Sequence, residues 1–212
     1  GALILAVLPA LVPPPVRAGA AAAAADGRRD MPGAMGLLIG VVTVRSWVQL
    51  GLTAYVPFLY VDVLGADPRV VGPLLFTFLG AGAVGTLVGG PIADRWGARR
   101  YVTASQLAAA PLITVFLLRA GDWIAPVFLA AAGFVLVSSF SVTVALGQAY
   151  MPRRLGTAAG LIVGFAIGTG GIGVALLGWV ADHWGVPAAL MATAALPLAG
   201  FAVALALPEP RA

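Results

Sequence analysis

The stretch GAGAVGTLVGGPIADRWG at residues 80–97 returns 88 residues later as GTGGIGVALLGWVADHWG at residues 168–185. Arg99 and Arg100 follow the first copy, whereas Val186 and Pro187 follow the second. Because basic loops stay in the cytoplasm, the two copies are predicted to end on opposite membrane faces. Such an inverted repeat is typical of many secondary transporters. The coinciding residues are Gly80, Gly82, Gly85, Gly90, Asp94, Trp96 and Gly97, and Gly168, Gly170, Gly173, Gly178, Asp182, Trp184 and Gly185.

The composition places this chain in a lipid bilayer. It is 61% hydrophobic and only 9% charged, whereas a soluble domain is about 25% charged. There is no cysteine, which excludes disulfides and thiolate metal sites. The chain has arginines and no lysine, and all the arginines except Arg45 lie outside the predicted spans. This distribution indicates membrane orientation, because nucleic-acid binding requires a clustered basic face.

Apolar runs divide the chain. Residues 1–13 are too short to span a bilayer, which takes about 20 residues, and are predicted to be the end of a helix. The alternative is a signal peptide over residues 1–25, but no basic segment precedes its apolar run. Residues 14–34 are predicted to be a cytoplasmic linker, residues 35–207 a six-helix bundle, and residues 208–212 a cytoplasmic tail. The predicted spans are 35–61, 71–92, 101–118, 124–147, 157–180 and 187–207.

The arginines outside the spans favour one face. Only Arg69 and Arg119 lie on the face opposite the linker. This bias predicts that the linker, two of the loops and the C-terminus are cytoplasmic. The nine arginines on the linker's side are Arg17, Arg28, Arg29, Arg95, Arg99, Arg100, Arg153, Arg154 and Arg211.

The glycines of both copies follow a GxGxxG pattern inside membrane-length apolar runs. A dinucleotide site would need a preceding strand and an acid about 20 residues further on, and neither is present. Glycines at three- and four-residue steps instead leave a helix face that packs closely on a neighbour. Static packing and a sliding interface both fit this pattern. The expected packing glycines are Gly80, Gly82, Gly85, Gly168, Gly170, Gly171 and Gly173.

The loop GGPIADRWGARR at residues 89–100 resembles the cytoplasmic signature of the major facilitator superfamily. Ala98 departs from it, where an arginine is usual. The resemblance implies a gate that latches the outward-open state, with the Asp94 carboxylate accepting charge-assisted hydrogen bonds from arginines. A helix-ending turn with solvated charges is the alternative. The matching residues are Gly90, Asp94, Arg95, Gly97, Arg99 and Arg100.

Residues 76–97 and 147–183 also resemble the C-terminal half of the fosmidomycin-resistance branch of drug exporters. The resemblance implies that the bundle is helices seven to twelve of a twelve-helix fold, with residues 1–13 ending helix six. It departs at Ala149 and Arg153, where that branch is expected to have an acid and a glycine.

Arg45 lies within the first full span, about ten residues or roughly 15 Å from its start. A charge this deep costs at least about 2.5 to 3.5 kcal/mol, so it should face a cavity or a partner. Ser46, Gln49 and Thr53 extend a polar stripe along the same helix. We expect Arg45 to attract an anionic substrate, whose phosphonate-like oxygens a guanidinium binds bidentately, or to pair with an acid elsewhere in the carrier. A structural arginine bonded to backbone carbonyls is the alternative.

The remaining polar residues suggest little chemistry. His183, beside Asp182, is predicted to be a solvated loop residue or a proton-handling group, and Trp96, Trp123 and Trp184 to anchor at the membrane interfaces. No carboxylate lies in mid-membrane, so the titrating acid of a proton-coupled carrier would lie in the other half. No catalytic constellation, cofactor or metal site is expected.

The sequence and its resemblance together predict an all-α membrane protein, the C-terminal six-helix bundle of a major facilitator fold with an inverted repeat of three helices. The expected partners are a small-molecule substrate, the lipid bilayer and an N-terminal six-helix half. The expected function is proton-coupled drug export across the inner membrane, of a fosmidomycin-like anion, by alternating access. An uptake carrier and a non-transporting membrane scaffold are the alternatives.

Overall fold

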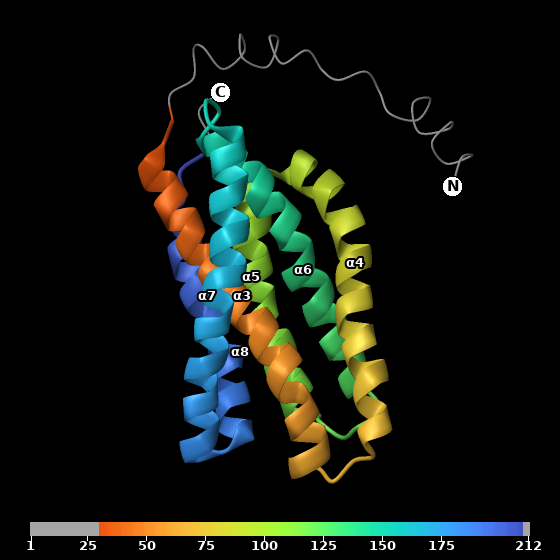
Figure 1. The fold of residues 1–212 in the computed structure, drawn as a ribbon. Coiled ribbons are helices and arrows are strands. Elements are labelled where there is room, and N and C mark those ends of the chain that lie inside the picture. The colour runs from red at the N-terminus through yellow and green to blue at the C-terminus, as the bar shows by residue number, and fades with distance from the viewer. Residues whose placement is uncertain (1–29, 210–212) are drawn as a thin grey trace, which may run out of the picture.

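The computed structural model describes residues 30–209, which form an elongated bundle of helices (Figure 1). Six of the helical segments in this range are long and apolar enough to cross a membrane. The predicted all-helical fold with six spans is therefore confirmed. The helices are α3 (Pro32–Phe58), α4 (Val71–Trp96), α5 (Ala98–Leu118), α6 (Ala125–Tyr150), α7 (Leu155–Trp184) and α8 (Val186–Leu205), with a π-helix η1 (Leu59–Val63) and a 3₁₀-helix η2 (Pro68–Val70) between α3 and α4.

Two helices, α4 and α7, extend past the ends that the apolar runs predicted. Helix α4 continues to Trp96 and α7 to Trp184, four residues past each predicted end. Each is followed by a single residue, Gly97 with φ of 96° and Gly185 with φ of 86°. Glycine adopts these positive values without a Cβ clash, so the chain reverses in one residue. The repeated glycine that closes each motif is thus the turn of each helical hairpin.

The helices alternate in direction, which gives the bundle two ends. One end, the Arg99 end, holds the starts of α3, α5 and α7 and the last residues of α4, α6 and α8. The other end, the Arg69 end, holds the turns at 59–70, 119–124 and 185. Trp96 therefore lies at the Arg99 end and Trp184 at the Arg69 end (Figure 1). The two copies of the motif run antiparallel, as the inverted repeat requires.

The two repeats of three helices make equivalent contacts with each other. In each repeat of three helices, α3–α5 and α6–α8, the middle helix packs on the first helix of the other repeat. Helix α4 packs on α6, and α7 packs on α3. The third helices also cross over, α5 onto α6 and α8 onto α3. Helices α3 and α6 therefore form the shared centre of the bundle, between both repeats.

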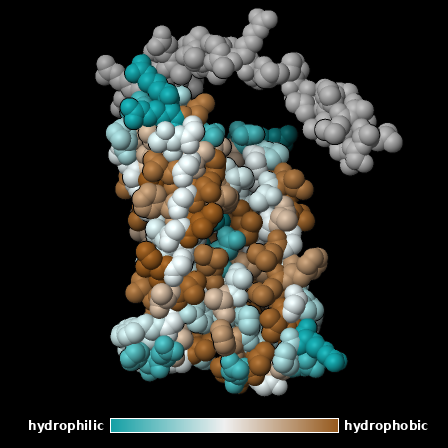
Figure 2. All heavy atoms as spheres, viewed as in Figure 1, coloured by the Kyte–Doolittle hydropathy of each residue, from teal (hydrophilic) through white to brown (hydrophobic). Residues whose placement is uncertain are grey.

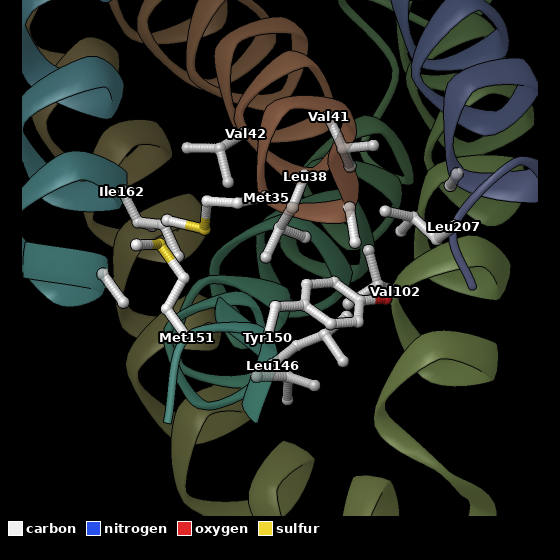
Figure 3. Close-up of a cluster of buried hydrophobic side chains, with 14 of the residues drawn as sticks. Met35, Leu38, Val41, Val42, Val102, Leu146, Tyr150, Met151, Ile162 and Leu207 are labelled. Carbon is white, nitrogen blue, oxygen red and sulfur yellow. The ribbon is translucent and has the colours of Figure 1, made fainter. Parts of the chain in front are cut away.

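Two apolar clusters fill the interior. The cluster at the Arg99 end includes Leu38, Leu146 and Tyr150 (Figure 3). The cluster at the Arg69 end includes Phe78 and Phe116. In lipid such cores stabilise through close packing, because hydrocarbon surrounds the helices on the outside too.

The outer surface carries a broad apolar belt between hydrophilic ends (Figure 2). Phe76 and Leu87 on α4 are each 78% exposed, and Ile172 on α7 is 57% exposed. A soluble monomer rarely exposes so large an apolar area. The belt and the six apolar helices are the features of a multi-pass membrane protein.

Candidate functional site

Arg45 joins the two repeats at the centre of the bundle. It lies in α3 and is only 4% exposed. Its Nη1 donates a hydrogen bond to the Leu136 carbonyl oxygen of α6 at 2.8 Å, and its Cζ lies 4.8 Å from the centroid of the Phe140 ring. Its buried Nε finds no hydrogen-bond partner within residues 30–209. Because a guanidinium has five donor hydrogens, this one bond to a backbone carbonyl leaves capacity for a ligand.

A cavity of about 330 Å³ lies beside Arg45, between α3, α6 and α7. This volume is at the lower end of the range for small-molecule sites, about 300 to 1,000 Å³. Arg45, Ser46 and Gln49 line it, whereas Thr53 lies outside the lining and donates to the Gln49 carbonyl oxygen at 2.9 Å. The rest of the lining is apolar: Leu50, Val137, Phe140, Val163, Ala166 and Ile167.

Arg45 belongs to a polar layer that sequence reasoning missed. The Tyr101 and Ser138 hydroxyls are 2.7 Å apart, and the Ser139 hydroxyl donates to the same Leu136 carbonyl that Arg45 binds, at 2.8 Å. Both amide atoms of buried Gln106 have no partner among the described residues. On α3, α5 and α6 this layer separates the two apolar clusters. Figure 2 shows a hydrophilic patch at mid-height within the apolar belt.

The signature loop lies at the Arg99 end, where Arg99 contacts the end of α8. Its Nη2 donates to the Leu205 carbonyl oxygen at 3.0 Å, and its Nη1 is 3.5 Å from Glu209 Oε1. Arg95 lies in the last turn of α4 and Arg100 in the first turn of α5, and neither forms an ion pair with Asp94 within residues 30–209. The expected latch through the Asp94 carboxylate therefore remains a prediction.

The chain after α8 folds back onto the bundle at this end. Tyr150 donates from its hydroxyl to the Pro208 carbonyl oxygen at 2.6 Å. Leu207 is only 1% exposed and lies in the cluster with Val102 (Figure 3). Together with the contacts of Arg99, this hydrogen bond and the burial of Leu207 hold residues 206–209 against the start of α5 and the last turn of α6.

The predicted packing glycines divide into two groups. A Cβ added at Gly82 would lie 2.6 Å from Val137, and one at Gly85 would lie 2.5 Å from the Phe134 carbonyl oxygen, both on α6. Their repeat equivalents, Gly170 and Gly173, are as tightly packed on α3, against Leu50 and Trp47. Gly80 has only Phe76 nearby, at 3.9 Å, while Gly90, Gly168 and Gly171 face open space.

Aromatic side chains gather at the Arg69 end of α7. The Trp179 ring lies 4.6 Å from the His183 ring and 5.2 Å from the Trp184 ring, centroid to centroid. His183 Nδ1 is 2.8 Å from the Trp179 carbonyl oxygen, and Trp123 is 87% exposed at the same end. Such exposed aromatic groups suit a membrane interface. Within residues 30–209 no cluster of metal-binding side chains is present.

The chain is similar in sequence to known membrane transporters. The Major Facilitator Superfamily profile matches residues 37–212. An uncharacterized MFS-type transporter of Bacillus subtilis (strain 168), YfnC, is 46% identical over 135 residues, which are 64% of this chain and 32% of the relative. The fosmidomycin resistance protein of Escherichia coli (strain K12) is 32% identical over 178 residues, 84% of this chain and 43% of the relative. The matched residues thus cover less than half the length of either relative.

Proposed function

Because the chain belongs to the Major Facilitator Superfamily, we propose that it forms one six-helix half of a secondary transporter that exports a small organic anion. The superfamily is a family of transporters and not of enzymes. A second half of six helices would complete the carrier, since the matched residues cover less than half of each relative. The substrate would resemble fosmidomycin, a phosphonate, as the name of the second relative suggests.

Arg45 is the observation on which this proposal depends. It is a buried cation at mid-height of α3, and it lines a cavity that also holds the Gln49 amide and the Ser46 hydroxyl. Keeping a charge at this depth is costly, so a function is the default explanation. The guanidinium binds phosphonate oxygens bidentately, while the apolar walls at Phe140 and Ile167 accept a carbon skeleton.

The orientation of the bundle follows from its arginines. Among residues 30–209, the Arg99 end carries Arg95, Arg99, Arg100, Arg153 and Arg154, whereas the other end carries only Arg69 and Arg119. The positive-inside rule therefore favours a cytoplasmic Arg99 end, with the C-terminus on that side of the inner membrane.

Transport would proceed by alternating access, with the two halves of the carrier rocking around the Arg45 cavity. Every carboxylate within residues 30–209 lies outside the middle of the spans. If a proton gradient drives export, the titrating acid is therefore expected in the other half. Half a carrier has only one wall of the central path, so the isolated chain should not catalyse flux into vesicles.

The test compares variants of the intact carrier in inverted membrane vesicles, where export appears as uptake of labelled fosmidomycin. Arg45→Ala should abolish transport, and Arg45→Lys should reduce it strongly, because an ammonium lacks the bidentate geometry. Arg154→Gln is the matched control, since Arg154 is an exposed arginine at the Arg99 end that lies outside the cavity lining. Wild-type transport in both Arg45 variants would remove this residue from the site. Accumulation by intact cells would instead indicate an uptake carrier.

A further inference from the structure

A second and larger cavity lies at the Arg69 end of the bundle, with a volume of about 580 Å³. Its walls come from the end of α3 with η1, the start of α4, and the turn before α6. They are apolar for the most part, through Leu64, Val70 and Leu74. None of the predicted site residues lines it. Its volume is well inside the range of small-molecule sites.

One face of α6 contributes to both cavities, and α3 continued by η1 runs from the first cavity to the second. Gln49 lines the first cavity and Tyr60 the second, and these residues are eleven apart. Val137 and Pro126 on α6 have the same relation. Eleven residues of α-helix make about three turns, so Val137 and Pro126 share a face of α6, about 16 Å apart along its axis. Tyr60 lies two residues past the end of α3, in η1, so this register does not extend to it. A ligand leaving the Arg45 cavity along this face of α6 would reach the second cavity.

Three features of the second cavity favour an anion. Arg69 lines it and forms no ion pair within residues 30–209. The first turns of α4 and α6, at Pro73 and Pro126, both contribute to its wall, and helix N-termini carry partial positive charge. Tyr60 is only 7% exposed, and its hydroxyl, which lies near the Gly121 backbone N–H, has no acceptor for its own proton among the described residues. A ligand oxygen would provide the acceptor that this hydroxyl lacks.

A π-helix sets the position of Tyr60. Helix α3 widens into η1 over Leu59–Val63, and the Tyr60 carbonyl oxygen accepts a hydrogen bond from the Ala66 backbone N–H at 2.8 Å. The Tyr60 ring stacks on Phe116, with centroids 6.4 Å apart. Single-turn π-helices are frequent at functional sites. Here one fixes the phenol in the wall of the cavity.

The second cavity also contains a group that opposes an anion. Asp122 lines it, and its carboxylate lies 3.5 Å from the Arg119 guanidinium, at the exposed end of the bundle. The Asp67 carboxylate, which also lies near Arg69, accepts a hydrogen bond from the Arg69 backbone N–H. An anion beside Arg69 would therefore be bound less tightly than one beside Arg45, where none of the described carboxylates lines the cavity.

We propose that this cavity is a second, weaker binding site for an organic anion with an apolar body, occupied by the transported molecule at the Arg69 end of its path. The inference rests on the proposed function for the identity of the ligand. Arg69 binds the anionic group, Tyr60 donates to it, and Leu64 and Leu74 contact the apolar body. Asp122 weakens the site, which favours release.

Single cysteines can test the two sites separately, because this chain has no cysteine of its own. In the intact carrier, with any other cysteine replaced by serine, Leu64→Cys reports on the second cavity and Val163→Cys on the Arg45 cavity. Val63→Cys is the matched control, because Val63 is an exposed neighbour that lines neither cavity. The measurement is the rate of maleimide labelling against the concentration of phenylphosphonate, with benzylammonium as the cationic control.

Phenylphosphonate should slow labelling at positions 64 and 163 but not at 63, with a higher half-protection concentration at 64. Arg69→Gln should raise that concentration at position 64 about tenfold, the loss of one charge-assisted hydrogen bond, and leave position 163 unchanged. Asp122→Asn should lower it at 64. Arg45→Ala should remove protection at position 163 only.

Several results would overturn the inference. Protection at 163 without protection at 64 would remove the second site and leave the proposed function intact. Weaker protection at 64 in Asp122→Asn, or protection there by benzylammonium, would show that the cavity prefers a cationic group. Loss of protection at 64 in Arg45→Ala would mean that one site acts on both cysteines. Protection at neither position would overturn the proposed function as well.

Discussion

The substitution Gly85→Ala is expected to force α4 away from α6, although alanine has a higher helix propensity than glycine. A Cβ at this position would lie 2.5 Å from the Phe134 carbonyl oxygen, whereas ordinary contact begins at 3.4 Å. The obstacle is backbone, which has no rotamer by which to move aside. Across the same crossing, a Cβ on Gly133 of α6 would meet the Phe78 carbonyl oxygen of α4. The two helices must therefore separate by about 1 Å to accept the methyl group.

The size of the effect follows from two opposing terms. Overpacking costs roughly 1 to 3 kcal/mol, and an immovable backbone favours the upper value. Replacing glycine by alanine in a helix returns about 1 kcal/mol, which leaves a net loss of about 2 kcal/mol. Gly80→Ala is the control in the same helix, because its Cβ would meet only Phe76, at 3.9 Å. That variant should gain about 1 kcal/mol, so the two variants should differ by about 3 kcal/mol.

The assay is reversible unfolding of both variants in mixed micelles by titration with dodecyl sulfate, followed by circular dichroism. Gly85→Ala should unfold at a lower fraction of dodecyl sulfate than the parent protein, and Gly80→Ala at an equal or higher one. Equal stability of the two alanine variants would refute the close crossing of α4 and α6.

Three further predictions concern topology and packing. In right-side-out vesicles, a cysteine at Trp184 should react with an impermeant maleimide and one at Trp96 should not; labelling of both from one side would contradict the antiparallel repeats. Gln106→Leu should leave the free energy of unfolding unchanged or raise it by about 1 kcal/mol, because neither amide atom has a partner among residues 30–209. A clear loss of stability would mean that the amide forms hydrogen bonds in the native protein. Tyr150→Phe should cost about 1 kcal/mol in the same measurement, through loss of the hydrogen bond to the Pro208 carbonyl oxygen, and an unchanged stability would show that this bond adds nothing.

The sequence predicts the architecture well because its signals are long. Six apolar runs of membrane length and a motif repeated without a gap leave few arrangements, and the structure has the six spans and the antiparallel copies. Burial of Arg45 was also predictable, because a single charge inside such a run has no route to water. Residues 1–29 and 210–212, which include the predicted helix end and most of the linker, lie outside the described residues.

Which face of each helix packs inward could not be read from the chain. In lipid both the buried and the outer faces are apolar, so the periodicity that marks the core of a soluble helix is weak. Gly80 and Gly85 both recur in the second copy of the motif, but of the two only Gly85 lies against the backbone of a neighbouring helix. Gln106 lies within a predicted span, and only the fold places it with Ser138 and Arg45 in one layer.

The second cavity escaped prediction for a related reason. Tyr60, Arg69 and Asp122 are spread over more than 60 residues, and each belongs to a turn or helix end where a polar group needs no special explanation. Only the packing of three helix ends brings them around one space.

A single cysteine in the Arg45 cavity can test whether this cavity opens to the two sides of the membrane in turn. Ile167 lines this cavity and is 72% exposed. In the intact carrier, Ile167→Cys should react with an impermeant maleimide from the cytoplasmic side in inverted vesicles and from the outer side in right-side-out vesicles. Labelling from one side alone under every gradient and ligand condition would contradict a cavity that opens to both sides in turn.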